Sequence, residues 1–298
     1  MTQTGLVVAS HGRHCVVEAS DGSRRLCHPR GKKNAVVVGD RVTWQISGDE
    51  GSVEAVSPRR NLLYRQDEIR SKSFAANLDQ VLILLAAEPE FSEMQLTRAL
   101  IACEAAQITP LLALNKRDLG EAFARAWSRL APYAAMGYPL LGLSLRVHPP
   151  ELDGLLARLA KRTTLVLGPS GVGKSTLINA LVPQAQAATQ EISRVLNTGK
   201  HTTTDTRWYW LDDARESALI DSPGFQAFGL HHLAAVDLAG LMPDLRAHLG
   251  QCRFHNCTHR HEPGCGVKDA LAGGQISASR HRLYETLFAE LEAAQQRH

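Results

Sequence analysis

The first 60 residues alternate short apolar runs with turn residues such as Asp-Gly at 21–22 and Gly-Asp at 39–40. Runs of high β-propensity between such turns predict strands. The expected strands are 5–8, 15–18, 25–28, 35–38 and 41–46. Five short strands within about fifty residues predict a small closed β-barrel over residues 1–60, of which the OB-fold is one form.

From residue 78 onward, uninterrupted apolar runs alternate with helix-like stretches. The runs at 80–87 and 110–114 lack polar alternation, which is typical of parallel strands covered on both faces. Helix-like stretches at 93–106 and 121–135 follow them. This order predicts an α/β domain with a parallel sheet over residues 78–230.

The remaining segments predict a multidomain chain. Residues 61–77 are polar and basic and indicate a linker. Residues 231–298 predict a mostly α-helical C-terminal domain, with a helix-like stretch at 231–249. One apolar stripe of the final helix indicates packing and consists of Leu283, Tyr284, Leu287, Phe288 and Leu291.

Composition is that of a soluble globular protein, with 298 residues, 44% hydrophobic and 21% charged. No apolar run approaches the roughly 20 residues that span a bilayer, and residues 1–4 open no signal peptide. We therefore expect a cytoplasmic protein without membrane contact.

The net charge of +3 resides in the first 60 residues, which hold nine Lys/Arg and six Asp/Glu. Residues 24–33 gather Arg, His and Lys, which suits a phosphate backbone. Trp44 could stack on a base or lie in the core. An RNA contact and a solvated charged loop therefore both stay open.

A glycine-rich turn between the apolar run 165–167 and the helix-like stretch 176–181 has the spacing of a P-loop. Its backbone N–H groups and the following helix N-terminus favour phosphate, although an ordinary turn is the alternative. Lys174 would reach the β- and γ-phosphates, and Ser175 would bind Mg²⁺. The expected binding residues are Gly168, Pro169, Ser170, Gly171, Val172, Gly173, Lys174, Ser175 and Thr176.

The motif Asn115-Lys116-Arg117-Asp118 indicates guanine as the base. Asp118 can accept both the N1–H and the N2 amino donors of guanine, whereas adenine would leave this carboxylate unpaired. Lys116 can lie along the ring, and Asn115 can bond to the base and brace the P-loop. Ser144 is expected near the base. A strand-ending turn is the alternative reading.

Asp221-Ser222-Pro223-Gly224 follows an expected hairpin of strands 208–211 and 217–220. It matches the corner at which NTPases sense the γ-phosphate, with Asp221 holding Mg²⁺ through water and the Gly224 N–H meeting the phosphate. The guanine motif precedes the P-loop, whereas ordinary small GTPases have the reverse order. The α/β domain is therefore circularly permuted, and this corner connects directly to the C-terminal domain.

The loop 183–204 ends in Gly-Lys-His-Thr-Thr-Thr, where Thr204, or else Thr203, is expected to bind Mg²⁺. Phe225 stands where many GTPases hold a Gln that orients the attacking water. We hypothesise that His201 orients this water. The expected catalytic residues are thus His201, Lys174 and Thr204.

Cys252, Cys257, His259 and Cys265 have the spacing of a closed tetrahedral zinc site, with His255 and His261 as competing ligands. No position for a catalytic water remains in such a site, so its role would be structural. Free thiols with an incidental histidine are the alternative. The other cysteines, Cys15, Cys27 and Cys103, are expected in the core.

Together, the barrel, the motifs NKRD, GPSGVGKST, GKHTTT and DSPG, and the cysteine cluster resemble the ribosome small-subunit-dependent GTPase A family of bacteria. The resemblance covers essentially the whole chain. It implies an OB-fold, a permuted GTPase domain and a zinc domain that use GTP or GDP, Mg²⁺ and one structural Zn²⁺.

The resemblance also implies GTP hydrolysis stimulated by the small ribosomal subunit and its rRNA during late maturation of that subunit, coupled to release. We expect a monomer. The alternative function is a nucleotide-gated RNA-binding or translation factor with little catalysis of its own.

Overall fold

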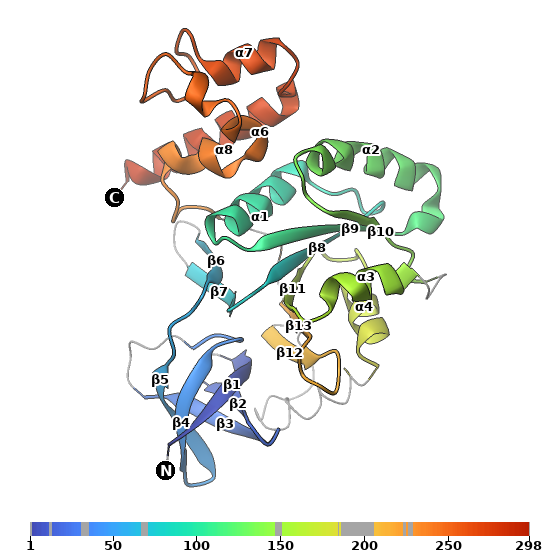
Figure 1. Cartoon of the computed structure of the whole chain (residues 1–298), viewed down its shortest axis with the longest axis vertical. Coiled ribbons are helices and arrows are strands. Elements are labelled where there is room, and N and C mark those ends of the chain that lie inside the picture. The colour runs from blue at the N-terminus through green and yellow to red at the C-terminus, as the bar shows by residue number, and fades with distance from the viewer. Residues whose placement is uncertain are drawn as a thin grey trace.

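The computed structural model describes residues 2–11, 14–30, 36–66, 71–146, 151–183, 185, 206–222, 225 and 229–297. These residues form a barrel, a central sheet flanked by helices, and a helical C-terminal domain (Figure 1). The barrel and the C-terminal domain lie at opposite ends of the molecule (Figure 1). One eleven-stranded sheet runs through the first two parts, in the order β10-β9-β8-β11-β13-β12-β1-β2-β3-β5-β4.

The predicted N-terminal barrel is confirmed. It consists of β1 (Thr2–His11), β2 (His14–Ala19), β3 (Arg24–Pro29), β4 (Arg41–Ser47) and β5 (Glu50–Val56). β1 pairs with both β2 and β4, which closes the barrel. Trp44 is only 3% exposed and packs with Cys15 and Cys27 in the interior, so it belongs to the core. Burial raises the pKa of Cys15 to about 12, as expected of an unreactive core thiol.

The predicted strand at 35–38 is wrong within its described part, since residues 36–40 form no strand, and β5 is the fifth strand. Gly39 has a φ of +90°, which permits a tight turn. The Asp40 carboxylate accepts a hydrogen bond from the Val37 N–H at 2.9 Å and an ion pair from Arg59 at 2.7 Å. These local bonds favour the turn over a ladder.

The segment predicted as a linker contains β6 (Leu62–Gln66) and β7 (Ser71–Ala76), which pair antiparallel. Leu63 and Phe74 are buried and join the main core. A strand pair with one buried face has few apolar residues, so its composition resembles that of a linker. The boundaries near residues 60, 77 and 230 stay predictions.

The predicted parallel sheet is confirmed in the centre of the molecule. Ile83 contacts the cluster that contains residues of α1 and α2, whereas its neighbour Leu82 faces the cluster of α3 and α4. Helices therefore cover both faces, as the uninterrupted apolar runs predict. The strands are β8 (Gln80–Ala86), β9 (Thr109–Asn115), β10 (Leu140–Gly142), β11 (Thr163–Leu167) and β13 (Ala218–Asp221), with β12 (Thr206–Trp210) antiparallel to β13. The helices are α1 (Glu93–Ala105), the 3-10 helix η1 (Arg117–Leu119), α2 (Glu121–Ala135), α3 (Glu151–Leu159) and α4 (Lys174–Leu181).

The C-terminal domain packs its final helix against short helical pieces, and polar side chains of that helix contact α1. Pro243 cannot continue a helix from the preceding turn, so the stretch predicted at 231–249 is divided. Its parts are η2 (Ala235–Leu241), α6 (Pro243–Arg246) and η3 (Leu249–Gln251), followed by α7 (Gly266–Ala272) and α8 (Ala278–Gln295). None of the helices in the described ranges combines the length and hydropathy that a membrane span requires.

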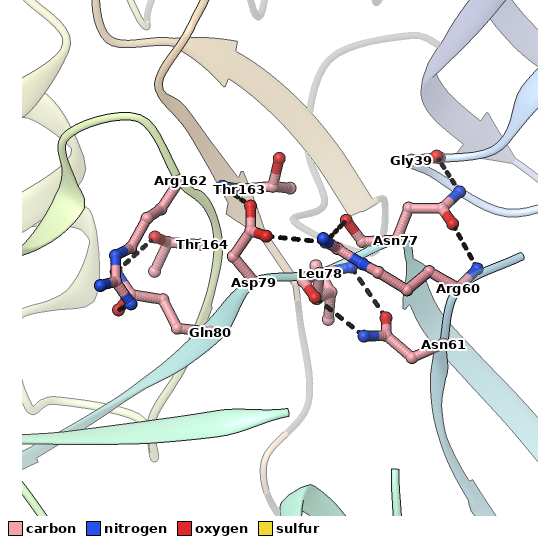
Figure 2. Close-up of polar contacts among 10 residues, drawn as sticks. All are labelled: Gly39, Arg60, Asn61, Asn77, Leu78, Asp79, Gln80, Arg162, Thr163 and Thr164. Atoms are coloured by element: carbon pink, nitrogen blue, oxygen red, sulfur yellow. Dashed lines mark hydrogen bonds and ion pairs between the residues drawn. The ribbon is translucent and has the colours of Figure 1, made fainter. Parts of the chain in front are cut away.

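A polar junction joins the barrel to the amino ends of β8 and β11 (Figure 2). Asn77 donates to the Gly39 carbonyl at 2.9 Å and accepts from the Arg60 N–H at 2.8 Å. The Arg60 guanidinium forms an ion pair with Asp79 at 2.8 Å, and Asp79 in turn accepts from the Thr163 N–H at 2.7 Å. One chain of bonds thus connects a barrel loop to the strand that leads into the P-loop.

Candidate nucleotide site and metal site

The glycine-rich turn lies at the carboxyl end of β11 and leads directly into α4. Gly171 and Gly173 have φ values of +81° and +103°, a region that favours glycine. A Cβ at Gly168 would lie 2.6 Å from the Leu84 carbonyl oxygen, and one at Gly173 would lie 2.5 Å from Asn115 Nδ2. Both the conformation and the close approach explain why glycines occupy these positions.

A cleft of about 760 Å³ opens over this turn. Its size suits a nucleotide, and its wall contains the P-loop on one side and the guanine motif on the other. Both motifs follow carboxyl ends of parallel strands, where open α/β sheets bind ligands. The lining includes Asn115, Lys116, Asp118, Leu145, Gly168, Pro169, Ser170, Gly171, Gly173, Lys174, Ser175, Thr176 and Phe225.

Asn115 is the residue that connects the two sides of the cleft. Its Nδ2 donates to the carbonyl of Val172 in the P-loop at 2.8 Å. Its Oδ1 accepts from the Leu145 N–H at 3.2 Å. Ser144, which precedes Leu145, donates through Oγ to Asp118 at 2.9 Å. The loop after β10 therefore orients both side chains that are expected to contact the base.

Lys116 has a φ of +67°, and its ammonium group contacts the Glu88 carbonyl at the rim of the cleft. Leu145 and Glu88 were absent from the sequence prediction. Leu145 acts through its backbone N–H, so its side-chain type gives no signal. Only its place next to Ser144 could have indicated it.

The end of β13 meets the P-loop lysine. The Lys174 ammonium contacts Asp221 and also donates to the Ser222 carbonyl at 3.3 Å. Ser175 and Thr176 line the same cleft. Lys174 thus connects Asp221 to the cleft that Ser175 lines, and both of these side chains offer oxygen donors of the kind that suits Mg²⁺.

Phe225 is buried and lines the cleft one residue beyond Gly224. Its side chain carries no polar atom that could orient a water molecule. The expected residues His201, Thr203, Thr204 and Gly224 lie outside the described residues.

The cysteine cluster forms where the sequence predicts it. His259 Nδ1 lies 3.5 Å from the sulfurs of both Cys252 and Cys265, which are 4.0 Å apart. Together with Cys257, all four ligand atoms lie within 4.8 Å of one another. Zn–S bonds of about 2.3 Å at tetrahedral angles would place two sulfurs about 3.8 Å apart. The donor set and its spacing therefore fit a four-coordinate zinc ion.

Hydrogen bonds around the cluster orient its loop. His281 Nε2 lies 3.0 Å from the His259 carbonyl, and the Tyr284 hydroxyl donates to the Thr258 carbonyl at 2.7 Å. Glu262 accepts from the Thr258 N–H at 2.7 Å. Burial disfavours the charged form of Glu262, yet the hydrogen bonds that it accepts from Thr258 and from neighbouring backbone N–H groups lower its pKa overall. Of the described histidines, only His259 joins the cysteine cluster, so His255 and His261 are not part of it.

Three of the basic residues expected to face RNA are paired with carboxylates of the barrel. Arg24 contacts Glu18, His28 contacts Glu50, and Arg30 contacts Glu54, at 2.9, 3.3 and 2.9 Å. The hydrogen bond from Arg30 lowers the pKa of Glu54. The described part of this segment, which is mostly β3, is therefore less positive than its composition indicates, and residues 31–35 lie outside the described ranges.

Comparison with known proteins decides the family. The family model described as RsgA GTPase matches residues 56–231. The chain belongs to the RsgA GTPase family. The resemblance stated from the sequence is thereby confirmed, and the chain is a GTP hydrolase of this family.

Similar proteins extend the match over nearly the whole chain. The small ribosomal subunit biogenesis GTPase RsgA of Variovorax paradoxus is 65% identical, covering 96% of this chain and 92% of that protein. The crystal structure of YjeQ from Thermotoga maritima has a TM-score of 0.76 at 29% identity, covering 98% of this chain and 99% of that one. YloQ, described as a circularly permuted GTPase, has a TM-score of 0.72 at 26% identity, covering 98% and 96%. The circular permutation predicted from the order of motifs is confirmed.

Proposed function

We propose that this chain hydrolyses GTP during late maturation of the small ribosomal subunit, that the subunit stimulates hydrolysis, and that hydrolysis is coupled to release of the protein from the subunit. The observation that carries the proposal is the 65% identity, over nearly the full chain, to a protein named for that role. The alternative, a nucleotide-gated RNA-binding or translation factor with little catalysis, is not favoured because family and relatives are named as GTPases.

In the proposed mechanism, Asp118 accepts the N1–H and N2 amino donors of guanine, and Ser144 holds this carboxylate in place through its 2.9 Å hydrogen bond. Asn115 couples base recognition to the P-loop through Val172. Lys116 lies along the ring. The glycine-rich turn binds the phosphates through its backbone N–H groups.

Lys174 exchanges Asp221 for oxygens of the β- and γ-phosphates when GTP binds. Ser175, Asp221 and one switch threonine, Thr204 in preference to Thr203, would hold Mg²⁺. The metal would neutralise charge that develops on the phosphates. The Gly224 N–H contacts the γ-phosphate. His201 orients the attacking water, since the side chain of Phe225 has no polar atom to do so.

Cys252, Cys257, His259 and Cys265 hold one structural Zn²⁺. A closed set of four protein ligands leaves no place for a catalytic water, so the ion stabilises the C-terminal domain. We further propose that the protein acts in the cytoplasm as a monomer and contacts rRNA of the small subunit.

The test is turnover of GTP by the His201→Ala variant, with and without small subunits. Nucleotide affinity should stay within about twofold of the unmodified protein. Stimulated turnover should fall by roughly 10²-fold or more, which is typical when a side chain that acts on the reacting groups in the transition state is removed. Unchanged stimulated turnover would remove His201 from the mechanism.

A further inference from the structure

The barrel pairs with the hairpin of β12 and β13, and the residues of β12 that pair with it lie at the carboxyl end of the parallel sheet. β1 pairs antiparallel with β12, in the register Ala9 with Arg207 and Ser10 with Thr206. In Figure 1 the barrel lies beside this hairpin and continues its sheet. The outer strand of the hairpin is therefore not a free edge, because the barrel occupies it.

A buried carboxylate makes the second contact between barrel and hairpin. Glu18 of β2 is only 4% exposed. Its Oε1 accepts from Trp210 Nε1 at 2.8 Å and lies 3.4 Å from Arg215 Nη1. Arg24, within the barrel, donates to Oε2 at 2.9 Å. A buried charge is tolerated only when it is paired, and the hairpin supplies two of these three partners. Glu18 thus favours the docked hairpin.

The other end of the hairpin reaches the phosphate side of the cleft. The hydroxyl of Thr206 lies 3.4 Å from that of Ser222, and both residues are buried. The Ser222 carbonyl accepts from Lys174, the P-loop lysine. Arg207 pairs with Asp221 in the ladder. The strand that contacts the barrel therefore also fixes the backbone that meets Lys174 and Asp221.

We propose that Glu18 and Trp210 are positioning residues for GTP hydrolysis, which transmit the binding of the small subunit from the barrel to Lys174 and Asp221. The inference rests on the proposed function, since it concerns how the subunit stimulates turnover. It requires that the hairpin has two positions relative to the P-loop, and that the subunit favours the one bonded to the barrel. Neither residue touches the nucleotide.

The junction of Figure 2 provides a matched control. It also connects barrel and α/β domain at the amino ends of strands, level with Trp210, since Trp210 pairs with Ala218 and Ala218 with Thr163. It differs in the strands that it bonds, which are β8 and β11 and not the hairpin (Figure 2). Arg60→Ala removes the ion pair with Asp79 and leaves the hairpin contacts unchanged. If these contacts only attach the barrel, Arg60→Ala and Trp210→Phe should lower stimulated kcat by similar amounts. If the hairpin transmits subunit binding, only Trp210→Phe should lower it.

The experiment compares full-length Trp210→Phe, Glu18→Gln and Arg60→Ala proteins. Trp210→Phe removes the indole N–H but retains an aromatic ring beside Trp208, which lies 5.1 Å away between ring centroids. Turnover is measured without subunits and at saturating small subunits, and subunit affinity is measured separately. We expect stimulated kcat of Trp210→Phe to fall roughly tenfold, with basal kcat and subunit affinity within about twofold.

Glu18→Gln keeps an acceptor for Trp210, so its stimulated kcat should fall less than that of Trp210→Phe. Because the two residues act through one bond, the double variant should lose no more than Trp210→Phe alone. If Trp210→Phe does not fold, Arg215→Ala, at an exposed turn, weakens the same contact and should lower stimulated kcat in the same direction.

Stimulated kcat that is unchanged in Trp210→Phe, or lowered equally in Arg60→Ala, would overturn the inference. A loss of subunit affinity without a loss of kcat at saturation would also overturn it. If the unmodified protein shows no stimulation by small subunits, the proposed function fails, and this result differs from a variant that responds like the unmodified protein.

Discussion

Arg280 is a buried cation that fixes α8 against the α/β domain, and its removal is expected to lower the free energy of unfolding of the C-terminal domain. The side chains of Arg280 and Asp244 are 5% and 9% exposed. Arg280 donates from Nε to Asp244 at 2.8 Å and from Nη2 at 3.1 Å. Its Nη1 donates to Thr97 of α1 at 2.9 Å. One guanidinium therefore connects α8, α6 and α1.

The magnitude follows from what Arg280→Ala leaves behind. Burial opposes the charge of Arg280, yet the hydrogen bond to Asp244 raises its pKa overall. Without the guanidinium, the Asp244 carboxylate would stay buried without its cation, which costs about 3–5 kcal/mol. Replacing both partners by apolar residues, as in Asp244→Leu with Arg280→Met, should recover most of this loss.

The assay is equilibrium urea unfolding followed by circular dichroism, with the free energy taken from the transition that includes α8. Arg282→Ala is the matched control, because Arg282 lies exposed on the same helix. That control should change the free energy of unfolding by no more than about 0.5 kcal/mol. The reasoning is refuted if the free energy of unfolding of Arg280→Ala is less than about 1 kcal/mol below that of Arg282→Ala.

Three further predictions concern specificity, metal and pH. Asp118→Asn should weaken GTP binding roughly hundredfold without improving ATP binding, because charge-assisted bonds to guanine are lost; calorimetric titration measures this, and unchanged GTP affinity contradicts it. The purified protein should contain one zinc ion per chain, and its removal by a strong chelator should lower the melting temperature, whereas Cys103→Ser should retain the metal. The hydrogen bond from Arg98 lowers the pKa of Glu290 in the folded protein. The ion pair therefore stabilises the fold fully above pH 4.5, the ordinary pKa of this group, and this stabilisation is lost as pH falls through the lowered pKa of the folded state. Glu290→Gln should therefore flatten the dependence of stability on pH below about 5, and an unaltered slope would exclude this ion pair as its cause.

Local patterns in the sequence predict most of the site. The P-loop glycines follow from backbone geometry, since Gly173 needs a positive φ and a Cβ there would meet Asn115. The apolar runs at β8 and β9 predict a sheet with two covered faces, and the clusters around Leu82 and Ile83 confirm it. In each case the residues that carry the signal lie within one short segment of the sequence.

Contacts between distant segments cannot be predicted from local sequence patterns. Trp210 and Glu18 are 192 residues apart in the chain, and Arg280 and Thr97 are 183 apart. Neither pair has a local pattern, because the partner of each side chain lies in a distant segment of the chain. The misassigned strand at 35–38 has the same origin, since the bond from Arg59 to Asp40 outweighs the β-propensity of three valines.

Hydrolysis of GTP by the purified protein alone, with small ribosomal subunits and with large subunits, tests the central claim most directly, with ATP as the control nucleotide. The account predicts slow hydrolysis by the protein alone, strong acceleration by small subunits only, and no hydrolysis of ATP. Equal rates in all mixtures would contradict the account.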